Sequence, residues 1–273
     1  MSTVNRRVLP GFLPSLGFTT LYLSGLVLIP LAAIIIKSAS LSFAEFLAAA
    51  ASPRAVAAYL LTFGVSVAAA SINVVLGMIV AWTLVRYDFP WKRLVDALVD
   101  VPLALPTAVA GLVYAGLYLP GGWIGQWLVP LGIEVANTRL GIVVVLVFTG
   151  FPFVVRAVQP VLADLDAEAE EAAAVLGASR WQTFCRVLLP MLIPPAVTGF
   201  ALAFARGLGE YGSVIFISSN MPYRTEIAPV LVVSRLEEFA YAEAASVAVV
   251  LLMLSFAMLA AINTLERWSQ RDV

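Results

Sequence analysis

The sequence predicts an all-α integral membrane protein, and three observations support this fold class. The 273 residues are 62% hydrophobic and 12% charged, with a mean hydropathy of +0.97. A soluble domain carries about 25% charged residues, and a chain this apolar would expose large hydrophobic patches to water. Apolar runs long enough to cross about 30 Å of hydrocarbon as helices recur along the chain.

Six segments meet this length requirement, so about six transmembrane helices are expected. They are 16–36, 58–84, 99–119, 140–159, 192–215 and 241–265. Pro102 and Pro106 lie near the start of the third segment and predict a bend or a late helix start, because proline lacks a backbone donor. The first segment resembles a signal peptide in position, but its length favours a retained anchor.

The chain is interpreted as one transmembrane domain, 1–273. Residues 1–57 hold the N-terminal tail, the first span and an outer loop, and residues 58–265 form the core. With the N-terminus inside, ten lysines and arginines lie on the inner side and five on the outer side. This bias predicts that both termini and residues 160–190 are cytoplasmic.

Composition excludes several kinds of site. The chain has no histidine and one cysteine, Cys185, so it has neither a histidine-based catalytic or metal site nor an internal disulfide. The net charge of −1 provides no basic patch for nucleic acid. The chain carries no phosphate-binding loop. We therefore expect no catalytic residue, no metal ligand and no bound cofactor, and any ATP would be used by a separate subunit.

Residues 160–190 form a polar island in the apolar chain. Asp166 is a candidate N-cap for a first short helix, whose early glutamates suit the helix dipole. Gly177 can adopt the left-handed conformation that ends this helix. Ser179 and Gln182 fit a capping box that opens a second helix. That second helix is expected to run to about Leu189 and to stop at Pro190.

A second unusual segment follows the island, at the end of the fifth predicted span. Arg206 and Glu210 lie four residues apart on a helix and can pair, as ionisable groups at membrane depth usually must. One interpretation is a structural ion pair that fixes helix packing. The other is that the segment lines a transport path or gate, formed by Arg206, Gly209, Glu210, Tyr211, Gly212 and Ser213.

The island resembles the EAA loop of the permeases of ABC importers, in which Glu-Ala-Ala, three residues, Gly and nine residues precede Ile-x-Leu-Pro. The matching residues are Glu171, Ala172, Ala173, Gly177, Leu189 and Pro190, and Val187 replaces the isoleucine. The resemblance implies the type I importer permease fold, with a cytoplasmic coupling helix that docks on a separate ATP-binding subunit. The alternative is a solvated acidic loop without a partner.

Two further segments resemble the T-type subunit of sulfate/thiosulfate permeases. They are Asp100–Leu112 and Ala205–Ile217, the latter followed by Asn220-Met221-Pro222. The resemblance implies a bacterial inner-membrane importer of sulfate or thiosulfate. Its implied partners are a homologous W-type permease subunit, two ATP-binding subunits, a periplasmic sulfate/thiosulfate-binding protein and membrane lipid. Molybdate permeases are the competing resemblance, because molybdate is also a tetrahedral dianion.

Two questions stay open at this level. A secondary carrier or channel is the alternative to an ATP-driven importer, although such carriers often show two matching halves. The outer loop 218–240, broken by Pro222 and Pro229, is either a gate region or an ordinary surface loop. A short helix from about Val230 to Phe239 is expected there, with Arg235 near Glu238.

Overall fold

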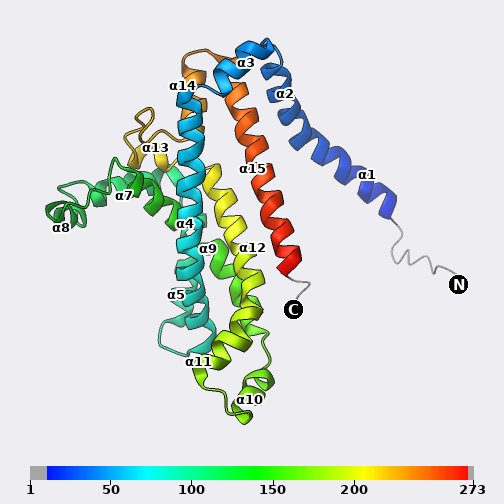
Figure 1. The fold of residues 1–273 in the computed structure, drawn as a ribbon, viewed down its shortest axis with the longest axis vertical. Coiled ribbons are helices and arrows are strands. Elements are labelled where there is room, and N and C mark those ends of the chain that lie inside the picture. The colour runs from blue at the N-terminus through cyan, green and yellow to red at the C-terminus, as the bar shows by residue number, and fades with distance from the viewer. Residues whose placement is uncertain (1–10, 270–273) are drawn as a thin grey trace, which may run out of the picture.

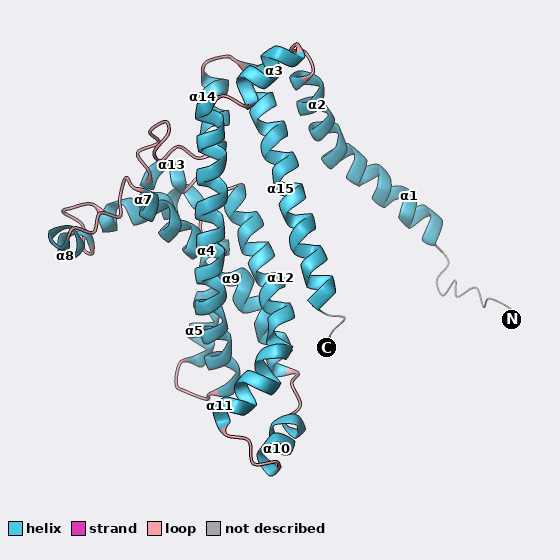
Figure 2. Ribbon diagram, viewed as in Figure 1, coloured by secondary structure: helices cyan, strands magenta, loops and turns pink. Residues whose placement is uncertain are grey.

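The computed structural model describes residues 11–269, and every regular element in that range is a helix (Figure 1, Figure 2). The four long helices are α4 (Pro53–Arg86), α9 (Arg139–Ala163), α12 (Leu189–Leu208) and α15 (Tyr241–Ser269). The N-terminal helix consists of α1 (Phe12–Leu23), the π-helical turn η1 (Ser24–Leu28) and α2 (Ile29–Ser38). The shorter elements are α3 (Phe43–Ala50), α5 (Lys92–Val99), α6 (Val101–Ala104), α7 (Thr107–Tyr118), α8 (Gly125–Leu128), the 3₁₀ turn η2 (Val129–Leu131), α10 (Ala167–Val175), α11 (Arg180–Thr183), the π-helical turn η3 (Phe184–Leu188), α13 (Val214–Ile217) and α14 (Ala228–Glu237).

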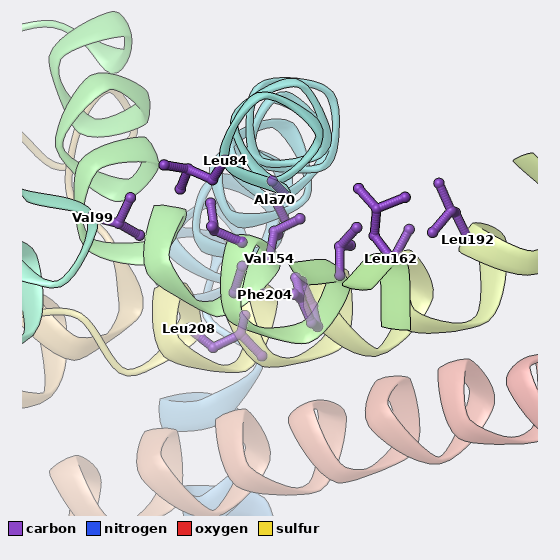
Figure 3. Close-up of a cluster of buried hydrophobic side chains, with 13 residues drawn as sticks. Ala70, Leu84, Val99, Val154, Leu162, Leu192, Phe204 and Leu208 are labelled. Carbon is purple, nitrogen blue, oxygen red and sulfur yellow. The ribbon is translucent and has the colours of Figure 1, made fainter. Parts of the chain in front are cut away.

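The core lies where α4, α9 and α12 pack together. Figure 3 shows Val154 of α9 between Ala70 of α4 and Phe204 of α12, and all three side chains are fully buried. Gly199 lets α12 approach this point closely, since a Cβ there would lie 2.8 Å from the Cα atom of Val154. Small residues at such crossings are the usual means of close packing between membrane helices.

Within residues 11–269, five helices are long and apolar enough to cross a membrane, where the sequence predicted six. They are Phe12–Ser38, Pro53–Arg86, Arg139–Ala163, Arg180–Leu208 and Tyr241–Ile262. The first, second, fourth and sixth predicted spans are confirmed as continuous apolar helical segments. The first helix diverges from the bundle over most of its length (Figure 1). None of its most apolar 18-residue stretch is buried against the rest of this chain.

The third predicted span, 99–119, is wrong as a single helix. It is divided into α6 and α7, and Leu105 and Pro106 between them are extended, with ψ of 129° and 128°. Pro106 has no N–H to continue the hydrogen-bond ladder, and its ring disfavours helical backbone at Leu105. The predicted bend is therefore confirmed, and α7, with 12 residues, is too short to span the membrane alone.

The fifth span differs from its predicted range, 192–215, at both ends. Pro190 does not stop the preceding helix, because α11, η3 and α12 form one continuous helical segment, Arg180–Leu208. The π-helical turn η3 interrupts the regular hydrogen-bond ladder directly before Pro190, where a missing N–H and a proline ring are tolerated. At the other end, α12 stops at Leu208, and the chain turns before α13.

Candidate functional site: a coupling segment and a pair of broken helices

The joint after α10 has the geometry that the sequence predicted. Gly177 has a φ of +80°, its N–H donates to Ala174 O at 3.0 Å, and the Ala178 N–H donates to Ala173 O at 3.0 Å. These two bonds form a Schellman motif, which requires a left-handed residue after the helix. Asp166 occupies the predicted N-cap position, and its side chain forms no capping hydrogen bond with the described helix.

The second short helix begins with the predicted capping box. The Gln182 N–H donates to Ser179 Oγ at 3.3 Å, and the Ser179 N–H donates to Gln182 Oε1 at 2.8 Å. Two of the orphan donors at the start of α11 are thereby satisfied. Ser179 and Gly177 together fix the sharp turn between α10 and α11.

The residues of the EAA motif separate into an outward and an inward set. Glu171 and Ala172 are exposed, whereas Ala173 is buried against the rest of the chain. Val175, the last residue of α10, and Leu176 are each 87% exposed, and α10 lies at one tip of the molecule (Figure 1). An exposed apolar pair next to an acidic face is a surface suited to a protein partner.

The ion pair that holds α10 in place was not identified from the sequence. Arg86, the last residue of α4, donates to Glu170 at 2.5 Å, and its guanidinium lies 5.3 Å from the ring centre of Trp82. Glu170 therefore faces the bundle, and its neighbour Glu171 faces solvent. The sequence placed Arg86 and the island on the same side of the membrane, but could not determine which acid the arginine contacts.

At the far end of α12, the predicted pair at membrane depth is present. Arg206 Nη1 lies 2.5 Å from Glu210 Oε2. The other carboxylate oxygen, Oε1, accepts from the Ser213 N–H at 2.9 Å and from the Ser213 hydroxyl at 2.8 Å. Glu210 thus stabilises the turn between α12 and α13 as well as Arg206, a second role that the sequence analysis missed.

The turn between α12 and α13 packs directly on α7. A Cβ added to Gly111 of α7 would collide with the Ser213 backbone, and a Cβ added to Gly212 would collide with the Thr107 hydroxyl. The close approach therefore requires glycine at position 111, where the obstructing atoms are backbone, whereas at position 212 the Thr107 hydroxyl would have to rotate away. It brings together the two segments with the T-type resemblance, and each of them contains a break in a membrane helix.

The segment that follows α13 is joined to α4 by a buried acid. Glu226 accepts two hydrogen bonds from Arg54, at 2.8 and 2.6 Å, and is only 3% exposed. Tyr211 and Asn220 line a cavity of about 240 Å³ beside this pair. Further along the chain, α14 and the Arg235–Glu238 contact of 2.9 Å confirm the predicted helix and ion pair.

The start of the first broken helix is held by Arg156, for which the sequence predicted no role. Its guanidinium donates to both carboxylate oxygens of Asp100, at 3.0 and 2.6 Å, and to Asp96 Oδ1 at 2.7 Å. These hydrogen bonds link α9 to α5 and to the start of α6. The hydrogen bond from Arg156 holds the pKa of the Asp96 carboxyl below its ordinary value of 3.8.

The two groups of predicted site residues lie at opposite ends of α12. Leu189 and Pro190 begin the helix, and Arg206 lies in its last turn. The 20 residues of α12 span about 30 Å at 1.5 Å per residue. The coupling segment and the broken-helix pair are therefore connected by one rigid element and do not form a single site.

Comparisons with known proteins agree with this arrangement. Residues 73–273 match the model of the family described as "Binding-protein-dependent transport system inner membrane component". The chain is 48% identical over 270 residues to the "Sulfate transport system permease protein CysT" of Escherichia coli (strain K12), covering 98% of both chains. It is 51% identical over 254 residues to the protein of the same name from Synechococcus elongatus, covering 93% of this chain and 91% of that one.

Among solved structures, the fold is similar to a chain in "Crystal structure of a bacterial ABC transporter involved in the import of the acidic polysaccharide alginate". The TM-score is 0.76, with 15% identity, covering 94% of this chain and 96% of that chain. At this identity the likeness shows the fold alone. The family model and the two relatives cover most of the chain, and the protein therefore belongs to the binding-protein-dependent transport system inner membrane component family.

Proposed function

We propose that this chain is the T-type permease subunit of an ATP-driven importer of sulfate and thiosulfate. The observation that carries the proposal is the 48% identity to a sulfate transport system permease along 98% of both chains. The chain contributes part of the translocation path and couples it to ATP hydrolysis on a separate subunit. Its own role is that of a non-catalytic membrane subunit.

The geometry supports two separate roles at the two ends of α12, coupling at its start and part of the transport path at its end. Glu171, Ala172, Ala173 and Gly177 form the coupling joint, which passes force to α12 through Leu189 and Pro190. At the other end, the turn from Gly209 to Ser213 lines the path together with α7. A dianion crossing there needs donors in a wet cavity, because it cannot enter hydrocarbon bare.

Arg206 and Glu210 act as a unit in this proposal. Glu210 is almost fully buried and accepts from Arg206 and Ser213, whereas Arg206 is about one-third exposed. A buried carboxylate is a poor ligand for an anion, so its role is to hold Arg206 and the turn in position. The exposed part of the Arg206 guanidinium is then the cationic surface offered to the path.

The proposed assembly contains a homologous W-type permease subunit, two ATP-binding subunits and a periplasmic sulfate/thiosulfate-binding protein. A solved structure with a similar fold is described as a bacterial alginate ABC transporter in complex with a pentasaccharide-bound periplasmic protein. By analogy, the outer end of this chain would receive a binding protein. The subunit lies in the bacterial inner membrane with both termini cytoplasmic.

Uptake of labelled sulfate tests the proposal. A strain that lacks its own sulfate permease subunits would express this chain with a W-type permease subunit, an ATP-binding subunit and a sulfate-binding protein. Sulfate should accumulate, and unlabelled thiosulfate should compete while molybdate competes weakly or not at all. Uptake of molybdate in preference to sulfate would assign the chain to the competing oxyanion. Uptake without an intact ATP-binding subunit would indicate a carrier or channel.

A further inference from the structure

We propose that the groove between α4 and the α11–η3 segment binds one anionic phospholipid of the cytoplasmic leaflet. The groove encloses about 890 Å³, at the large end of the 300–1,000 Å³ typical of ligand sites. Its walls come from α4 on one side and from Trp181, Phe184 and Leu189 on the other. The proposal uses the topology given above, in which this end of the chain is cytoplasmic.

The length of the groove matches one leaflet. Along α4 it runs from Val74 to Thr83, which is about 14 Å at 1.5 Å per residue, and it continues to Tyr87 directly after the helix. Half of the hydrocarbon core measures about 15 Å, with the headgroup region beyond it. The wall residues Val75 and Ile79 are 60% and 58% exposed, so the groove is open to an acyl chain along its apolar part.

The end near the cytoplasm carries the groups that recognise a headgroup. Trp82 and Trp181 both contact the ring of Phe184, with ring centres 5.4 and 5.7 Å apart. Tryptophan and tyrosine concentrate at the membrane interface because one part of each ring is apolar and the other polar. Trp181 is 72% exposed and Tyr87 is 58% exposed, as expected of groups that contact lipid headgroups.

Arg180 supplies the charge. It lines the groove and is exposed, and among the side chains that the structure describes no carboxylate forms an ion pair with it. The nearby Arg86, in contrast, is neutralised by Glu170. An unpaired guanidinium beside a leaflet-length apolar groove complements a lipid with a net negative headgroup. A zwitterionic lipid would match the groove but not the charge.

The groove adjoins the segment that connects the coupling helix to α12. Its second wall, α11 and η3, follows the Gly177 joint and leads into α12. A bound lipid would therefore brace the segment through which the coupling helix acts on the membrane helices.

Photolabelling tests the proposal. The full-length chain, with the subunits that co-purify with it, is placed in phosphatidylcholine nanodiscs. These contain a trace of phosphatidylglycerol with a diazirine in one acyl chain, or the same probe built on phosphatidylcholine. Labelled peptides are mapped by mass spectrometry. The phosphatidylglycerol probe should label residues 74–87 and 180–189 more strongly than the phosphatidylcholine probe.

Two variants and their controls sharpen the test. Arg180→Gln should reduce phosphatidylglycerol labelling about fivefold, the fold-change that corresponds to about 1 kcal/mol for one cation near a charged headgroup, and leave phosphatidylcholine labelling unchanged. Ile79→Trp should fill the groove and reduce both. Arg93→Gln, an exposed arginine of α5, and Leu60→Trp, an exposed leucine at the other end of α4, should have no effect.

Equal labelling by the two probes, unchanged in Arg180→Gln, would overturn the proposal in favour of ordinary boundary lipid. Absence of groove labelling by either probe would overturn it in favour of a protein that covers the groove. Neither result depends on the transported anion, because labelling is measured without uptake. A failure of the proposed substrate would therefore leave the labelling pattern unchanged.

Discussion

The Arg206 guanidinium lies 2.5 Å from the carboxylate of Glu210, and the two residues differ sharply in exposure: 32% for the arginine side chain and 2% for the glutamate. Removing the arginine leaves a buried carboxylate held only by Ser213. Removing the glutamate leaves a partly solvated cation and two unsatisfied donors on Ser213. Removing Arg206 and removing Glu210 therefore have different structural consequences.

We expect Arg206→Ala and Glu210→Ala each to lower the folded yield in membranes, and the double variant to lose less than the sum of the singles. A coupling energy of about 1–2 kcal/mol is expected, because contacting charges in one network are not additive. Recovery in the double variant should be incomplete, since Ser213 still lacks its acceptor. Thermal unfolding in detergent and transport should both be measured.

The pair formed by Arg235 and Glu238 is the control, because its acid is 48% exposed whereas Glu210 is 2% exposed. Its coupling energy should not exceed about 0.5 kcal/mol, as for other exposed pairs on helices. If the losses of Arg206→Ala and Glu210→Ala simply add, the two residues act independently. Arg206 would then be assigned to the path as a direct anion contact.

Gly177 should be replaceable by asparagine but not by valine. A Cβ at this position would meet no atom within 4 Å, so the cost of substitution comes from the φ of +80° and not from crowding. Left-handed backbone costs an ordinary residue about 1–2 kcal/mol and a β-branched one more, whereas asparagine tolerates it. Gly177→Val should keep the subunit in the membrane and uncouple or release the ATP-binding subunit.

Co-purification of the ATP-binding subunit and ATP-driven uptake provide the measurement for Gly177. Normal ATP-driven uptake by Gly177→Val would show that the left-handed joint is not needed for coupling. A loss in Gly177→Asn equal to that in Gly177→Val would assign the effect to the side chain.

The neighbouring acids Glu170 and Glu171 should have different effects. Glu170→Gln breaks the contact with Arg86, in which both side chains are partly exposed, so it should destabilise the isolated subunit by no more than about 1 kcal/mol. Glu171→Gln should leave the unfolding temperature unchanged and weaken retention of the ATP-binding subunit. Identical unfolding temperatures for the two variants would show that the Arg86 contact does not hold α10.

Acid should weaken the clamp between Asp96 and Arg156. Because the hydrogen bond from Arg156 lowers the folded-state pKa of Asp96, its contribution to stability is present above the ordinary value of 3.8 and lost as pH falls through the folded-state pKa. The stability difference between wild type and Asp96→Asn should therefore be constant near neutral pH and shrink below about pH 4. Unfolding temperature against pH measures it, and a difference that grows on acidification would contradict the assignment.

Both termini and the EAA loop should lie in the cytoplasm. Reporter fusions after Val273 and within 160–190 should give a cytoplasmic signal, because lysine and arginine concentrate on that side. A periplasmic signal from either fusion would contradict the topology.

Hydropathy and local turn chemistry were sufficient to predict much of this protein. A long apolar run must form a helix in hydrocarbon, so the spans around α4, α9 and α15 could be located from composition alone. The Gly177 joint and the Ser179 capping box depend on neighbours within a few residues, which the sequence states directly. The pairing of Arg206 with Glu210 was predictable for the same reason, since the two lie one helical turn apart.

Only the tertiary structure decided which prolines interrupt a helix and which residues the interrupted helices contact. Pro106 divides its segment and Pro190 does not, because a π-helical turn precedes Pro190. The contact of Gly111 with the Ser213 backbone joins residues about a hundred positions apart, and the choice of Glu170 as the partner of Arg86 depends on how α10 is oriented against α4. Local propensity contains no information on contacts between residues far apart in the sequence. These contacts are set by the packing of α4, α7, α9 and α12 against one another.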